Sequence, residues 1–158
     1  MLNYHIRRAT VADAAVIARH RIRMFQDMGE LAADKTEALE SASRARLDGE
    51  LLSGEYVGWL VETGGEVVAG AGVLLHHYYP TKANPLGRPT AYIVNVYTEP
   101  GHRRQGLAGR LVAEILAWCR ANDIPRASLH TSQLGRSVYE RLGFAPTNEM
   151  RMDTPPIP

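Results

Sequence analysis

The sequence predicts an α/β domain in which a mixed, largely antiparallel central sheet carries helices on both faces. Strand-like and helix-like segments follow one another in the order βααβββαβαβ. A hairpin signal at residues 63–66 precedes a strand–helix–strand segment that spans residues 90–131. Hairpins build antiparallel pairs and strand–helix–strand crossovers build parallel pairs, so we expect both kinds of pairing in one sheet.

The N-terminal part of the chain is expected to form one strand and two helices. Residues 4–8 alternate like a strand, and Thr10 with Asp13 then resembles a capping box at a helix start. The apolar stripe predicted for this first helix consists of Val11, Ala14, Ala15, Ala18, Ile22 and Phe25. Gly29 ends the helix, and residues 34–52 read as a second, more polar helix that covers the core.

The middle of the chain is expected to supply three strands. Residues 56–61 and 67–75 are rich in β-formers and flank Thr63-Gly64-Gly65-Glu66, whose glycines suit the positive φ angles of a tight hairpin. Residues 76–89 read as an irregular loop, and the next strand covers residues 90–98.

The C-terminal part contains the clearest helix, because apolar residues recur at helical spacing from residue 106 to residue 121. Pro125 precedes a short strand predicted over residues 126–131. A short helix over residues 135–142 then ends at Gly143, and residues 144–152 read as a last strand. We predict one domain over residues 1–153 and a frayed tail over residues 154–158.

Composition restricts the function classes. Of the 158 residues, 45% are apolar, which is enough for one core, and 18 Lys and Arg stand against 17 Asp and Glu. With no global basic field, neither nucleic acid nor a membrane is an expected partner. The N-terminus has no signal-like apolar core and no run is long enough to span a bilayer, so we expect a soluble, cytoplasmic protein. The single cysteine, Cys119, excludes an internal disulfide and a Cys-rich zinc cluster; we expect it in the core and expect no metal.

The most informative stretch leads the strand at residues 90–98 directly into the helix at residues 106–121. The first N–H groups of a helix have no partner inside it and lie at the positive end of the macrodipole. Gly106 and Ala108 are small enough for close approach of a ligand, and Arg103 with Arg104 adds positive charge. The stretch therefore predicts an anion site, although a basic helix start with small residues for packing fits the same pattern.

Arg103-Arg104-Gln105-Gly106-Leu107-Ala108 resembles the acetyl-CoA signature of the GNAT N-acetyltransferase superfamily, Arg/Gln-x-x-Gly-x-Gly/Ala. The resemblance implies a GNAT-like fold with acetyl-CoA as cosubstrate, its pyrophosphate held by the backbone of residues 104–109. It also implies that the backbone of residues 96–98 contacts the pantetheine and the thioester oxygen. The cofactor-binding residues implied are Val96, Tyr97, Thr98, Arg103, Arg104, Gln105, Gly106, Leu107, Ala108, Gly109 and Ser132.

Residues 132–144 resemble the second superfamily motif, Asn-x-x-Ala-x-x-x-Tyr-x-x-x-Gly-Phe, through Tyr139, Gly143 and Phe144. Ser132 stands where asparagine is commonest. The resemblance implies that Tyr139 is the catalytic acid that protonates the departing thiolate, and a tyrosine pKa of about 10 suits that task. A purely packing role for Tyr139 is the alternative.

No general base carries over from the superfamily. Tyr92 stands where some members have a glutamate, and we expect Glu99 to face solvent. His76, His77 and Glu30 lie in predicted loops that would border an acceptor pocket. Deprotonation of the amine through water is an equally good account.

Three function classes remain from the sequence. The first is an acetyl-CoA-dependent N-acetyltransferase that acts on a small-molecule or peptide amine by direct attack in a ternary complex. The second is a noncatalytic acyl-CoA-binding or sensor domain. The third interprets His102, Arg103, Arg104 and Arg110 as a nucleic-acid patch, which the near-neutral net charge disfavours. A homodimer is compatible with each class, and the sequence does not identify the acceptor.

Overall fold

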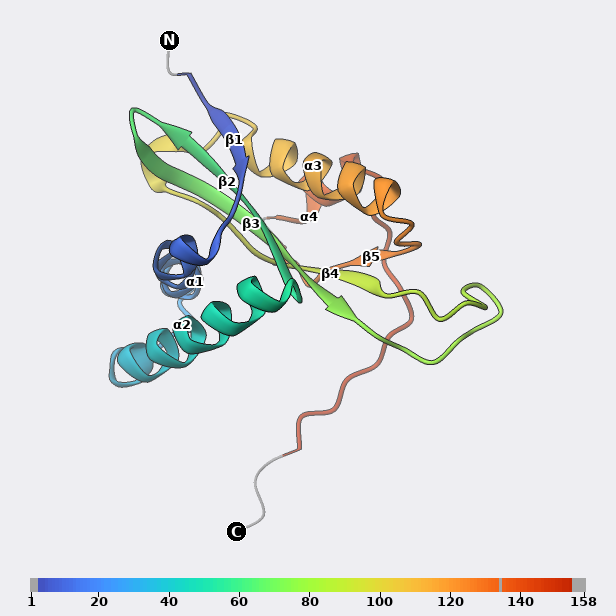
Figure 1. The fold of residues 1–158 in the computed structure, drawn as a ribbon. Helices are drawn as coiled ribbons and strands as arrows, with labels where there is room; N and C mark the ends of the chain where they lie inside the picture. The colour runs from blue at the N-terminus through green and yellow to red at the C-terminus, as the bar shows by residue number, and fades with distance from the viewer. Residues whose placement is uncertain (1–2, 134, 155–158) are drawn as a thin grey trace.

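The computed structural model describes residues 3–133 and 135–154. Helices α1 (Ala14–Asp27) and α2 (Thr36–Ser53) cover one face of a central sheet, and α3 (Leu107–Ala121) covers the other, with the short helix α4 (Arg136–Arg141) beside it (Figure 1). The predicted α/β fold class is confirmed. Among the described residues, no helix is both long enough and apolar enough to cross a bilayer.

The sheet follows the order of the chain: β1 (His5–Arg8), β2 (Tyr56–Thr63), β3 (Glu66–His76), β4 (Thr90–Thr98) and β5 (Ala127–Ser128). The first four strands pair antiparallel, and β5 pairs parallel with β4. Gly64 and Gly65 form the predicted tight turn with φ of 58° and 81°. Short 3₁₀ turns η1 (Val11–Asp13), η2 (Ala33–Lys35) and η3 (Pro100–His102) precede α1, α2 and the loop before α3.

Two apolar clusters hold the helices on the sheet. Beneath α3, Leu107, Leu111 and Ile115 are at most 2% exposed, and Cys119 is buried with them as expected. Beneath α1 and α2, the cluster consists of Ala14, Ile17, Ala18, Leu47, Tyr56 and Leu60. Burial of this apolar area supplies most of the free energy that favours folding.

The buried face of α1 differs from the prediction. Val11 is 43% exposed and Ala15 is exposed, whereas Ile17 and His20 are buried. The α-helix begins at Ala14, and residues 11–13 form a 3₁₀ turn with fewer residues per turn. The predicted positions Ala14, Ala18 and Ile22 are buried, so the predicted stripe fails at Val11, which precedes the α-helix, and at Ala15.

The strand predicted over residues 144–152 is wrong, because the chain there is irregular and runs away from the sheet (Figure 1). Pro146 fixes φ and lacks the N–H that a ladder needs. Beyond Phe144, which packs partly against the core, residues 145–152 are exposed, and Met150 and Met152 reach 94% and 80%. Of the predicted tail, residue 154 is exposed and irregular, and residues 155–158 lie outside the described part of the chain.

The strand predicted over residues 126–131 pairs with β4 over a much shorter length. Only Ala127 and Ser128 pair, opposite Ala91 and Tyr92. Further along β4 the register with β3 shifts between Gly70 and Gly72, where Asn95 adopts a φ of 56°. Such a bulge increases local twist and ends regular pairing, so β4 and the chain after β5 separate here.

Candidate active site

A cavity of about 1290 Å³ lies where β4 and β5 separate. Its wall is formed by residues 92–98 of β4, the N-terminal end of α3, residues 129–132, part of α4 and the C-terminal end of α1. Elements from both faces of the sheet thus meet at one opening, which is possible because β5 stops pairing after Ser128.

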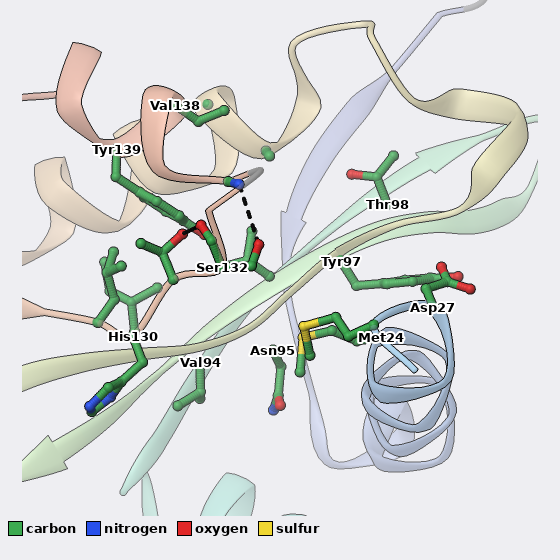
Figure 2. A pocket seen from close by; sticks show the side chains of 18 of the residues that line it. Met24, Asp27, Val94, Asn95, Tyr97, Thr98, His130, Ser132, Val138 and Tyr139 are labelled. Carbon is green, nitrogen blue, oxygen red and sulfur yellow. Dashed lines mark hydrogen bonds between the residues drawn. The ribbon is translucent and has the colours of Figure 1, made fainter. Parts of the chain in front are cut away.

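The cavity has two halves, one on each face of the sheet. Val94 packs against the apolar cluster beneath α1 and α2, whereas Val96 and Tyr139 pack against the cluster beneath α3. Figure 2 shows Met24 and Val94 on one side of β4 and Tyr139 on the other. We call the half on the side of Val94 the α1-facing half, and the half on the side of Tyr139 the α3-facing half.

The N-terminus of α3 faces the cavity with backbone donors that no described residue pairs. Arg110 N–H donates to the Gly106 carbonyl at 3.1 Å, so the N–H groups of residues 107–109 have no partner inside the helix. Gly106 has a φ of 72°, and a Cβ added at Gly106 or Gly109 would meet no atom within 4 Å. Open space, free donors and the positive end of a 15-residue helix make this end suited to an anion.

Arg103 and Arg104 have different surroundings although the sequence assigned both to the anion site. Arg103 Nε donates to the Thr98 carbonyl at 2.9 Å, and its guanidinium forms an ion pair with Asp27 at the end of α1. The hydrogen bond to Asp27 raises the pKa of Arg103. Arg103 therefore ties the loop to α1, while Arg104, with a φ of 62°, is exposed at the cavity.

In the described part of the chain, the edge of β4 beyond Tyr92 has no strand partner on the β5 side. Main-chain groups on that edge therefore face the gap between the strands. Val96 and Thr98 are half-buried there, and Tyr97 is buried with its ring centroid 5.1 Å from that of His20. The Tyr97 side chain thus packs between β4 and α1 while the residue lines the cavity.

Tyr139 enters the α3-facing half from α4. Its ring lies edge-on to Phe144 with centroids 5.9 Å apart, and burial raises the pKa of its phenol. Gly135 N–H donates to Ser132 Oγ at 3.3 Å. A Cβ at Gly135 would lie 2.8 Å from Thr131 Oγ1 and 3.5 Å from the Tyr139 ring, so a glycine is needed for these groups to converge.

The α1-facing half contains a polar network that sequence analysis missed. Arg21 Nη1 donates to Asn95 Oδ1 at 2.8 Å, and Asn95 Nδ2 donates to the Tyr56 hydroxyl at 3.3 Å. Tyr56 is buried, which raises its pKa to about 12. Arg21 and Asn95 are 74 positions apart, so no local pattern links them.

A second missed group lies beside this network. The Tyr92 hydroxyl hydrogen-bonds with His130 Nδ1, and the Tyr92 ring stacks on His76 with centroids 5.2 Å apart. Both Tyr92 and His130 line the cavity. Among the loop residues considered earlier as acceptor-pocket groups, Glu30 lines the cavity, whereas His76 and His77 do not.

Glu99 was expected to face solvent, but the structure encloses most of its side chain. Its side chain is 18% exposed, accepts a hydrogen bond from Arg23 and has Oε1 3.4 Å from His20 Nε2. That separation is within ion-pair range, yet among the described residues neither ring nitrogen of His20 makes a hydrogen bond, so we assign no bond to this pair. Because α1 packs over the end of β4, Glu99 is enclosed and held by Arg23.

Every cofactor-binding residue predicted from the sequence lines the cavity except Gln105, and Tyr139 lines it too. The residues that the structure adds to the wall come from α1 and the loop after it, from the N-terminal half of β4, and from the chain around β5 and α4. Their roles toward a ligand remain predictions.

The family model described as acetyltransferase (GNAT) family matches residues 23–144. The chain belongs to this family. N-acetyltransferase 8 from Rattus norvegicus is 32% identical over 98 residues, which is 60% of this chain and 42% of that relative. The chain therefore spans less than half the length of that curated relative.

Solved structures agree with the family assignment over nearly the whole chain. A GCN5-related N-acetyltransferase from Ralstonia eutropha has a TM-score of 0.88 at 32% identity, covering 96% of this chain and 99% of that one. A predicted acetyltransferase from Clostridium acetobutylicum, solved with acetyl-CoA, has a TM-score of 0.84 at 28% identity, covering 98% of this chain and 96% of that one.

Proposed function

We propose that the protein transfers the acetyl group of acetyl-CoA to a primary amine by direct attack of the amine within a ternary complex. One observation carries this proposal: a single cavity extends from the N-terminus of α3, past Tyr139 and into the α1-facing half. Acetyl-CoA in one half and an acceptor in the other would meet at the gap between β4 and β5.

The α3-facing half suits the cosubstrate. The free N–H groups of residues 107–109 and the positive helix end would hold the pyrophosphate, with Arg104 beside them. The unpaired edge of β4 offers alternating donors and acceptors to the pantetheine amides, as a sheet edge does to an added strand. The family relative solved with acetyl-CoA supports this assignment.

The chemistry requires three tasks of the protein. A backbone N–H on the free edge of β4 would stabilise charge on the thioester oxygen as the amine attacks, a contribution of about 3–4 kcal/mol for one such donor. Tyr139, kept protonated by its raised pKa, would protonate the departing thiolate. The amine proton would leave through water, because Glu99 is held by Arg23.

The first prediction tests the cosubstrate site. CoA should raise Tm, because a ligand at about 100 times its Kd stabilises the native state by about 2.7 kcal/mol. Gly106→Gln should abolish that rise by filling the space beside the donors. Gly54→Gln is the matched control: Gly54 has a φ of 81°, open space and a position at the C-terminal end of α2. Normal CoA affinity in Gly106→Gln, measured by calorimetry, would show that the phosphate lies elsewhere.

A further inference from the structure

Arg21 has an unusual environment in the α1-facing half. Its side chain is half-buried, and its hydrogen bond is to the neutral amide oxygen of Asn95 at 2.8 Å. The guanidinium carbon lies 4.8 Å from the centre of the Phe25 ring. Within residues 3–133 and 135–154, no carboxylate forms an ion pair with Arg21.

Two carboxylates at the junction of α1 and β4 are already engaged with other arginines. On α1, Arg23 pairs with Glu99, and Asp27 pairs with Arg103. Desolvation lowers the pKa of Arg21, and the positive charge of Arg46 adds to that effect. A cation removed from water without a counter-charge destabilises a protein unless a partner arrives. The cavity wall therefore holds a positive charge that the described chain does not neutralise.

We propose that the amine acceptor carries a carboxylate and that Arg21 binds it, a proposal that rests on the acetyl-transfer function above. A guanidinium has five N–H donors in a planar fork and matches a carboxylate with two parallel hydrogen bonds. Asn95 accepts from one nitrogen of Arg21 and so fixes the plane of the fork. The remaining donors are available to a ligand in the cavity that Arg21 lines.

The position of Asn95 brings this carboxylate site close to the proposed reaction centre. Asn95 lies at the bulge of β4, next to Val96 on the edge that faces the gap. An amine separated from its carboxylate by a few bonds, as in an amino acid, would thus approach the thioester. The wall around Arg21 also contains Met24, Phe25 and Met28, which suit an apolar side chain.

A purely structural role for Arg21, that of satisfying the buried Asn95 amide, is the competing explanation. Loss of such a role would lower the free energy of unfolding and would affect all acceptors alike. A carboxylate-binding role predicts instead a change in the ratio between acceptors that differ only in the carboxylate.

The test compares L-methionine and L-phenylalanine with their α-carboxamides as acceptors. Removing the negative charge lowers the amine pKa and leaves more neutral amine, so intrinsic reactivity favours the amides. Wild-type protein should nevertheless prefer each acid by about tenfold or more in kcat/KM, as expected for a charged hydrogen-bonded contact. Arg21→Gln should remove that preference by lowering kcat/KM for the acid. Arg19→Gln, an exposed position on the same helix, should keep it.

A binding measurement makes the test independent of turnover. The same four compounds are titrated into CoA-saturated protein by calorimetry, and each acid should bind more tightly than its amide only when Arg21 is present. An acid that binds no better than its amide, or a preference that survives in Arg21→Gln, overturns the proposal. Acetylation of the amides would then leave the proposed function standing. Arg21-dependent binding of acids without transfer to any amine would instead refute the proposed function and retain the site.

Discussion

Tyr139 is the residue on which departure of the thiolate depends in this account. It lies in the α3-facing half, beside the cluster formed by Gly135, Thr131 and Ser132. Burial raises its pKa, so the phenol stays protonated throughout the neutral range and remains a donor. The ring also packs on Phe144, so a test must remove the hydroxyl alone.

Tyr139→Phe should leave the Kd for CoA nearly unchanged and lower kcat by about 10²–10⁴-fold, the usual range for a positioned acid or base. Steady-state kinetics with the best amine and calorimetry with CoA measure the two effects. Tyr79→Phe, at a position that is 92% exposed, should behave like wild type. A folded Tyr139→Phe protein that turns over at the wild-type rate would leave water as the proton donor.

The site residues that the sequence revealed lie in short motifs, whereas the contacts that it missed join positions far apart in the chain. Gly106 and Tyr139 lie in short motifs that resemble those of the superfamily, and that resemblance predicted their place at the cavity. Arg21 stands near the end of the first predicted helix, but no pattern along one helix contains its contact with Asn95. Arg103 was assigned to the anion site, but its partner Asp27 is 76 positions away and was not predictable from the motif.

At the scale of elements, the junction between α1 and β4 positions the phosphate loop. The ion pair between Asp27 and Arg103 and the pair between Arg23 and Glu99 join the last two turns of α1 to residues 99–103. His20 is 2% exposed between these elements, and desolvation lowers its pKa to about 4. The junction is therefore built with a neutral imidazole at its centre.

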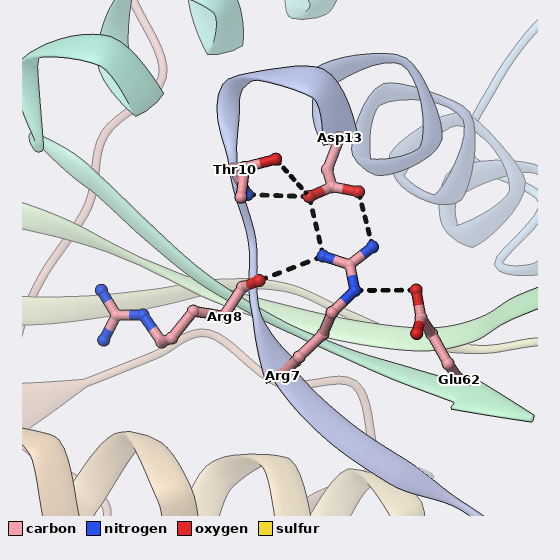
Figure 3. Close-up of polar contacts among 5 residues, drawn as sticks. All are labelled: Arg7, Arg8, Thr10, Asp13 and Glu62. Atoms are coloured by element: carbon pink, nitrogen blue, oxygen red, sulfur yellow. Dashed lines mark hydrogen bonds and ion pairs between the residues drawn. The ribbon is translucent and has the colours of Figure 1, made fainter.

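A second polar cluster fixes the start of α1 (Figure 3). Arg7 on β1 donates to both oxygens of Asp13 at 2.8 and 2.9 Å and to Glu62 on β2 at 2.7 Å. Asp13 also accepts from the Thr10 N–H at 2.7 Å, as the predicted capping box requires. The hydrogen bond from Arg7 contributes most to lowering the pKa of Asp13, which falls to about 2.

The lowered pKa values of His20 and Asp13 both make the protein less stable in acid. The folded-state pKa of His20, about 4, lies below its reference value of 6.5, so the unfolded chain binds the extra proton in that window. Stability should thus fall as pH drops from 6.5 to 4, by about 3 kcal/mol in total. Asp13 contributes stability above 3.8 that is lost as pH falls toward 2.

Urea unfolding at about pH 5 and pH 7 measures the His20 part of this prediction. Wild-type protein should be more stable at the higher pH. His20→Gln, which keeps a polar side chain without titration, should flatten the dependence. If the free energy of unfolding changes equally between the two pH values in both proteins, His20 binds its proton equally well in the folded and unfolded states.

Elements were predictable where the periodicity was strong and local. The helix at residues 107–121 and the hairpin turn at residues 64–65 agree with the sequence, because apolar spacing and glycine determine them. The length of β5 and the existence of the expected last strand were predicted wrongly, because each depends on whether a neighbouring strand is within reach. The bulge at Asn95 removes that neighbour from β5, and Pro146 weakens the last segment.

At the scale of the whole molecule, separation of β4 from β5 opens the sheet so that two ligands reach one gap from opposite faces. Helices α1 and α3 lie on those faces, and each contributes residues to one half of the wall. A continuous sheet would have closed this passage, so the short β5 is the structural basis of the proposed ternary complex.

The pH dependence of turnover follows from the same arrangement. Glu99 is held by Arg23, and we assign amine deprotonation to water, so kcat/KM should rise toward alkaline pH with the neutral fraction of the acceptor. Rates for one amine over about pH 6 to 9, with folding checked at each pH, give the profile. A flat profile would reveal a base in the cavity, for which His130 would be the first residue to replace.

The most direct test of the account is amine-dependent release of CoA. The protein is incubated with acetyl-CoA and a panel of amino acids, polyamines, aminoglycosides and peptides, while free CoA and the acetylated amine are both quantified. We predict stoichiometric formation of the two products with at least one primary amine, lost in Gly106→Gln and retained in Gly54→Gln. Tight, Gly106-dependent binding of acetyl-CoA with no acetylated product from any amine would contradict catalysis and favour a noncatalytic acyl-CoA sensor.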